Sequence, residues 1–275
     1  MNTLYHYTDL NALLSIIKNK QLWLTGANNL NDHKEISWTT TILAEKLSTL
    51  ATKQKEKADL LWHIYNHSLG VPFICSLTSE PDLLSQWRGY GDSAHGVAIG
   101  FRREALPSSE RIPFLSAVRA DSISLHQVIY ERALQEGLID EILSPIFLHQ
   151  RLDEQTNLAI SSAAAALNGL ATLLKNPAFS EEKEWRIIHR PMIMGRQGTN
   201  ESNVMLSISA PKHRIARNRL ITYFEYDLIP NDRGSVFSEL VLGPKCEISE
   251  YDLSIFLTLN GLSDLPIKKS VASYR

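Results

Sequence analysis

Residues 4–26, LYHYTDLNALLSIIKNKQLWLTG, decide the fold because they combine two strand patterns and a helix in one short span. The first residues predict a strand, and Thr8 or Asp9 then supplies a side-chain oxygen that can cap a helix. An apolar stripe at i, i+3, i+4 and i+7 predicts that helix, and its members are Leu10, Leu13, Leu14 and Ile17. QLWLTG at 21–26 predicts a second strand. The unusual residue is His6, an imidazole in the middle of the first strand.

The rest of the chain also mixes strands and helices, without the regular alternation of a doubly wound fold. Strands are expected at 71–79, 96–101, 183–193, 220–228, 238–244 and 267–275. Helices are expected over 33–67 with a break near TKQKEK, over about 122–174 with an interruption near Pro145, and over 248–262. No repeat or linker divides the chain. We therefore expect one α+β domain over 1–275, with a mainly helical insertion at about 102–180.

Composition is that of a globular protein, with 44% hydrophobic and 21% charged residues. The net charge of −2 excludes the global basic field that drives duplex binding, although it leaves room for a local basic groove. Cys75 and Cys246 are too few for a disulfide framework and lack metal-ligand spacing. The apolar stretches are too short to span a bilayer, and no signal-peptide pattern opens the chain. We therefore expect a cytoplasmic protein with no membrane partner.

The sequence lacks several common catalytic motifs, namely HExxH, the P-loop and GxSxG. GYGDSAHG is rich in glycine, but it precedes a strand and so fits the dinucleotide fingerprint poorly. His33 and Glu35 resemble the HxE of zinc deaminases, yet no PCxxC follows them. Residues at the start of a helix are the better interpretation of that pair. We expect no metal site.

Two carboxylates stand directly before the strand WRII. If the strand begins at Glu182, side chains alternate, and Glu182 and Glu184 share one face. Like charges side by side are unfavourable unless the protein uses them. The alternative is a solvated strand end in which Lys183 or Arg186 pairs with a carboxylate, and spacing alone favours this alternative.

Aromatic and hydroxyl residues mark the segment before that strand. Trp87 and Tyr90 share a face if 81–90 is helical, although two core or rim aromatics would give the same pattern. Ser76 stands near the end of an expected strand, where hydroxyls also serve as helix caps. His6 taken alone is more often a buried, hydrogen-bonded histidine than a functional one. The set is more informative than any member, because a strand histidine, strand-end hydroxyls, helix aromatics and E-x-E follow in that order.

That order resembles the ADP-ribosyltransferase superfamily, especially its histidine–tyrosine–glutamate branch. Residues 4–22 are similar to the opening of its DNA-modifying and toxin-type members. Over nearly its full length the chain also resembles a bacterial family of unknown function found in mobile and defence-associated gene neighbourhoods. The matching stretches are LYHYT, NLNDHKE, FICSLTS, LLSQWRGYGDSAHGVAIGF, EKEWRI, ELVLGP and SYR.

The transferase resemblance implies a mixed or antiparallel split β-sheet and NAD⁺ as co-substrate, with no metal. It implies that His6 binds a ribose hydroxyl with help from Thr8, and that Trp87 or Tyr90 stacks on nicotinamide. Glu184 would be the catalytic glutamate and Glu182 its partner. The remaining residues expected at the cofactor are Tyr7, Ser76 and Arg186, the last as a pyrophosphate contact whose alternative is a salt bridge.

This reading predicts a mono-ADP-ribosyltransferase that modifies an intracellular protein or nucleic acid, as a toxin or phage-defence effector. If the protein is a toxin, an antitoxin or immunity protein is a candidate partner. Breaking the nicotinamide–ribose bond builds positive charge on the sugar, which a fixed carboxylate stabilises. The alternatives are an NAD glycohydrolase, a non-catalytic nucleotide sensor and a structural or interaction protein.

Overall fold

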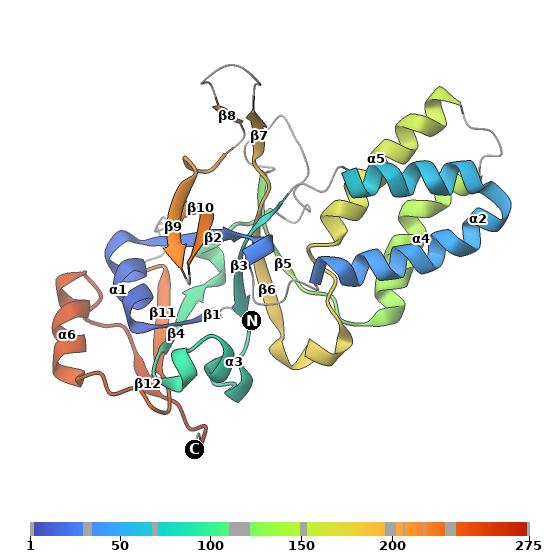
Figure 1. Cartoon of the computed structure of the whole chain (residues 1–275). Coiled ribbons are helices and arrows are strands. Elements are labelled where there is room, and N and C mark those ends of the chain that lie inside the picture. The colour runs from blue at the N-terminus through green and yellow to red at the C-terminus, as the bar shows by residue number, and fades with distance from the viewer. Residues whose placement is uncertain are drawn as a thin grey trace.

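The computed structural model describes residues 3–29, 35–67, 71–109, 122–148, 153–195, 202–205, 207–216, 218–228 and 235–273 (Figure 1). In this part of the chain a 10-stranded sheet is flanked by helices (Figure 1). All its strand pairs are antiparallel except that of β11 with β12, which is parallel. The protein is therefore mixed α and β, with an open, mixed sheet.

The sheet forks at β3 (Phe73–Thr78). One edge of β3 pairs along its whole length with β6 (Glu184–His189). The other edge is shared, because β2 (Gln21–Gly26) pairs with its first residues and β1 (Thr3–Thr8) meets it only at Tyr5↔Thr78. The two strands therefore diverge from β3 in opposite directions and leave its middle without a strand partner on that edge.

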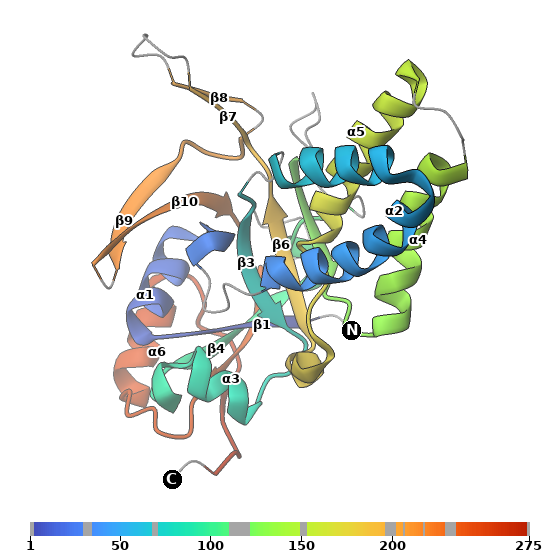
Figure 2. The same ribbon diagram turned by 45° about the vertical axis from the view of Figure 1, so that its right-hand side comes forward.

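Three arms of sheet continue from the fork (Figure 2). The arm of β1 continues through β4 (Val97–Arg102), β11 (Phe237–Leu242) and β12 (Ile267–Lys269). The arm of β2 continues through β10 (Arg219–Asp227) and β9 (Lys212–Ala216), and the arm of β6 ends at β5 (Ile123–Gln127). A separate hairpin is formed by β7 (Met192–Gly195) and β8 (Ser202–Met205).

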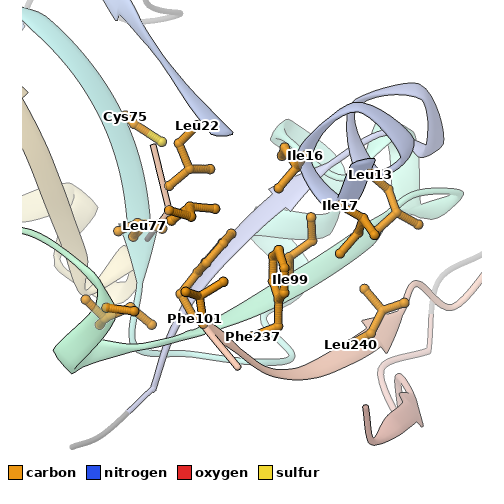
Figure 3. Close-up of a cluster of buried hydrophobic side chains, with 14 of the residues drawn as sticks. Leu13, Ile16, Ile17, Leu22, Cys75, Leu77, Ile99, Phe101, Phe237 and Leu240 are labelled. Carbon is orange, nitrogen blue, oxygen red and sulfur yellow. The ribbon is translucent and has the colours of Figure 1, made fainter. Parts of the chain in front are cut away.

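Helix α1 (Leu10–Asn19) joins β1 to β2, as the opening residues predict. Its cap is Asp9, whose carboxylate accepts a hydrogen bond from the Ala12 N–H at 2.8 Å. The apolar side of α1 packs on the sheet together with α6 (Glu250–Leu259), and this cluster is the main core (Figure 3). The short helix α3 (Leu84–Gly89) packs on the opposite face, against β1 and β4.

A second core lies among three helices beside β5 and β6 (Figure 1). These are α2 (Glu35–His67), α4 (Arg132–Leu148) and α5 (Glu154–Leu170). The expected break in TKQKEK is confirmed, because Gln54 has non-helical backbone angles inside α2. The helical stretch expected over about 122–174 is wrong at its start, since β5 belongs to the sheet. The helical unit thus draws on two separate parts of the sequence.

Two of the predicted strands have different bounds in the structure. The strand expected over 183–193 is divided into β6 and β7, because Pro191 lies between them and cannot donate a ladder hydrogen bond. The strand expected over 267–275 is shorter, since β12 ends at Lys269, and residues 274–275 lie outside the described part. His33 also lies outside it. Within the described residues, no helix combines the length and apolar character needed to cross a membrane.

Candidate functional site

A hollow of about 370 Å³, including its open mouth, lies at the fork between β1 and β3. Its lining residues are Tyr5, His6, Tyr7, Ser76, Leu77, Gln86, Tyr90, Glu182 and Glu184. They come from β1, β3, the α3 region and the entrance to β6. The hollow exists because β1 leaves β3 after a single residue pair, and most of its volume is open to solvent.

His6 bridges the fork. Its Nδ1 lies 2.9 Å from the Ser76 carbonyl oxygen, which can only accept, so Nδ1 carries the proton and donates it. Burial lowers the pKa of His6, and this outweighs the raising effects of the Ser76 hydrogen bond and the charge of Asp9. The imidazole is therefore neutral at pH 7. Its Nε2 is an acceptor, and no described residue bonds to it.

Glu182 and Glu184 both line the hollow, although they do not lie on one face of a strand as the sequence predicts. Glu182 ends a 3₁₀ turn (Pro177–Glu182), Lys183 adopts a left-handed conformation with φ of 43°, and the strand starts at Glu184. The expectation that the two glutamates share a strand face is therefore wrong. They meet because Lys175 Nζ lies 2.6 Å from Glu182 Oε2 and 3.1 Å from Glu184 Oε2.

Arg186 holds Glu184 from behind the hollow. Its Nε and Nη2 each lie 2.8 Å from one carboxylate oxygen of Glu184, and its Nη1 donates to the Thr172 carbonyl at 2.9 Å. The Arg186 side chain is buried and is not among the residues that line the hollow, so it is a salt-bridge partner there. Lys183, the other partner considered, pairs with Glu80 instead.

These contacts keep Glu184 ionised. Burial alone would raise the pKa of this carboxyl. The charge and hydrogen bonds of Arg186 outweigh burial, with help from Lys175 and Ser76, and the pKa lies well below its ordinary value of 4.5. The buried cluster thus pairs two carboxylates with two cations, and both glutamates still line the hollow.

The two candidate aromatics have different environments, so the expectation that they share a face is wrong. Trp87 is fully buried, donates its indole N–H to Asp82 at 2.6 Å and packs edge-on against the Tyr7 ring. The helix ends at Gly89, and Tyr90 lies just beyond it with non-helical backbone angles. Tyr90 is 41% exposed and lines the hollow, so its ring is the one available to a ligand.

Tyr7 and Thr8 complete the set expected from the sequence. Tyr7 lines the hollow, and its hydroxyl donates to the Glu80 carbonyl and accepts from the Leu83 N–H, both at 2.9 Å. These bonds fix the segment that leads into α3. Thr8 is buried opposite Val97 and does not line the hollow. The structure therefore brings together His6, Tyr7, Ser76, Tyr90, Glu182 and Glu184, and it leaves out Thr8, Trp87 and Arg186.

Four residues of the site escaped the sequence analysis: Tyr5, Leu77, Gln86 and Lys175. Gln86 precedes Tyr90 by one helical turn, so an i, i+4 search from Tyr90 would have found it. Strand alternation from Tyr7 would have found Tyr5. Lys175 had no signal, because it lies in an irregular segment after α5.

Comparison with known proteins gives a family without an assigned activity. The family model "Protein of unknown function (DUF2971)" matches residues 86–187. The matched segment begins at Gln86 and includes Tyr90, Lys175, Glu182 and Glu184, whereas His6 precedes it. No curated protein and no solved structure matches the chain. The match supports similarity to a family of unknown function.

Proposed function

We propose that the protein is an NAD⁺-dependent mono-ADP-ribosyltransferase whose hollow at the fork binds the nicotinamide and its ribose. One observation carries the proposal. Residues chosen from distant motifs, among them His6, Tyr90 and Glu184, converge on one hollow. The forked sheet agrees with the split sheet that the transferase resemblance implies. Residues that served only in core packing and helix capping would not be expected to line the same hollow.

The lining groups suit a ribose and a flat ring. The Nε2 acceptor of His6 is available to a sugar hydroxyl, and the exposed ring of Tyr90 can stack on the nicotinamide. The hollow is small and open to solvent, so the adenosine half of NAD⁺ would extend beyond it.

Glu184 has the properties that the bond cleavage needs. It is ionised, buried and fixed by Arg186, so its position costs no reorganisation during the reaction. As the nicotinamide–ribose bond breaks, positive charge grows on the sugar, and the carboxylate stabilises it through space and through the 2′-hydroxyl. Nicotinamide leaves with the bonding electron pair, and the acceptor nucleophile attacks the same carbon and loses its proton. The acceptor is a protein or nucleic acid in this proposal, in keeping with a toxin or defence effector and an antitoxin partner.

A non-catalytic nucleotide sensor is the second candidate, and a specific observation favours it. Both oxygens of Glu184 already accept from Arg186, and one also accepts from Lys175. If a ligand hydroxyl cannot compete with these cations, NAD⁺ binds without cleavage. The NAD glycohydrolase, in which water replaces the macromolecular acceptor, uses the same residues as the transferase.

The test measures nicotinamide release from NAD⁺, with and without bacterial lysate. Wild type is compared with Glu184→Gln and with the matched control Glu181→Gln, whose side chain is exposed three residues away. The transferase predicts release only with lysate, a loss of about 10²–10³-fold in Glu184→Gln, and unchanged release in Glu181→Gln. Release without lysate identifies the glycohydrolase. A folded wild type that binds NAD⁺ but releases no nicotinamide identifies the sensor, and equal release by Glu184→Gln refutes the catalytic role.

A further inference from the structure

We propose that Gln86 recognises the primary carboxamide of the ligand and so makes the hollow selective for an amide over the corresponding carboxylate. This inference rests on the proposed function, because the carboxamide in question is that of nicotinamide. It adds a specificity-determining residue that neither the motifs nor the family match assigns.

Gln86 is a buried polar side chain at the wall of the hollow. It is 8% exposed, and its amide forms no hydrogen bond with any residue in the described part of the chain. The amide atoms nevertheless keep contact with solvent, since they are not among the described side-chain atoms that are both fully buried and unpartnered. The amide is therefore free to exchange its water for a ligand that enters the hollow. A ligand that both donates to it and accepts from it would use both of its functions.

The position of Gln86 places it beside the stacking ring. The Tyr90 N–H donates to the Gln86 carbonyl at 2.9 Å where α3 ends, and both residues line the hollow. Trp87, on another side of α3, holds the helix in place through its hydrogen bond to Asp82. A ring stacked on Tyr90 would therefore present its edge, and any substituent on that edge, close to Gln86.

The chemistry of the lining favours an amide substituent. A glutamine amide donates and accepts, so it can form two complementary hydrogen bonds with a carboxamide. A carboxylate only accepts, and it would confront the Gln86 carbonyl oxygen. The described lining residues include no lysine or arginine that could neutralise a ligand carboxylate. Lys175, a buried ammonium beside the hollow, is already engaged by Glu182 and Glu184.

The experiment compares the binding of NAD⁺ with that of nicotinic acid adenine dinucleotide, which differs only in carrying a carboxylate. Dissociation constants are measured by titration calorimetry for wild type, Gln86→Leu and the matched control Gln127→Leu, an exposed glutamine at the end of β5. We expect wild type and Gln127→Leu to prefer NAD⁺ by about 10-fold or more. We expect Gln86→Leu to bind the two dinucleotides within about threefold of each other.

Each outcome decides between the proposals. If wild type binds both dinucleotides equally, the role of Gln86 is overturned while the proposed function stands. If Gln86→Leu keeps the full preference for NAD⁺, another group recognises the carboxamide, and the inference is again overturned. If wild type binds neither dinucleotide, both proposals fail. If Gln86→Leu does not fold, Gln86→Asn replaces it, because asparagine keeps the amide but has a side chain shorter by one methylene. Gln86→Asn should also lose the preference for NAD⁺.

Discussion

Lys175 and Glu184 form a buried ion pair, with Nζ 3.1 Å from Oε2 and both side chains less than a tenth exposed. Lys175 also binds Glu182, and Arg186 binds the other side of Glu184. These two cations balance the negative charges of Glu182 and Glu184, which lie next to each other at the wall of the hollow. Removing one member of such a cluster leaves an uncompensated buried charge, which costs more than the pair contributes.

Lys175→Met is therefore expected to lower the free energy of unfolding by about 3 kcal/mol, measured by urea denaturation. Lys183→Met is the matched control, because Lys183 pairs with Glu80 at the surface with its own side chain 56% exposed. Exposed pairs contribute at most about 1 kcal/mol. Equal effects of the two substitutions would show that the buried cluster has no special role in stability.

The stability of the protein should depend on Glu184 in a definite range of pH. Its pKa is lowered in the folded state, so the stability it contributes is present above the ordinary value of 4.5 and is lost as the pH falls below it. The difference in unfolding free energy between wild type and Glu184→Gln should be constant from pH 7 to 5 and should shrink towards pH 3. A difference that grows on acidification would contradict the ion pair.

His6 should be neutral with its proton on Nδ1. Because burial lowers its pKa below 6.5, the unfolded chain takes up a proton before the folded one, and stability falls as the pH drops below 6.5. Nitrogen-15 spectra of the histidine rings measure the tautomer directly, with the exposed His95 as a reference in the same sample. A protonated Nε2, or a charged ring at pH 7, would remove the acceptor that the ribose contact requires.

Asp82 fastens the C-terminal segment beside the hollow. Its carboxylate accepts from Ser270 Oγ at 2.5 Å, from Val271 N at 2.8 Å and from the Trp87 indole at 2.6 Å. Asp82→Asn is expected to cost about 2 kcal/mol, since hydrogen bonds to charged groups contribute more than neutral ones.

The same variant should speed amide hydrogen exchange in residues 267–273 and weaken NAD⁺ binding, because α3 carries Gln86 and is followed directly by Tyr90. The exposed Asp264→Asn is the control and should leave exchange and binding unchanged. If exchange speeds up while NAD⁺ binding does not change, the C-terminal segment is not needed to position α3.

Much of the local structure could be predicted from the sequence. The stripe through Leu13 and Ile17, and the cap at Asp9, specify α1 through contacts between residues a few positions apart. The break at Gln54 was predictable for the same reason. Where the predictions of secondary structure failed, contacts with residues far away in the sequence determined the structure. Residues 123–127 are predicted as part of a helix but form β5, because the edge of β6 supplies their hydrogen bonds.

The sequence by itself determined which residue types were available for chemistry, namely a strand histidine, two aromatics and an E-x-E pair. Only the tertiary structure decided that His6, Tyr90 and Glu184 line one hollow, that Trp87 belongs to the core and that Arg186 holds a carboxylate. It also brought Lys175 to both glutamates. The physical reason is that caps and helical stripes depend on neighbours in the chain, whereas the hollow depends on where β1 leaves β3.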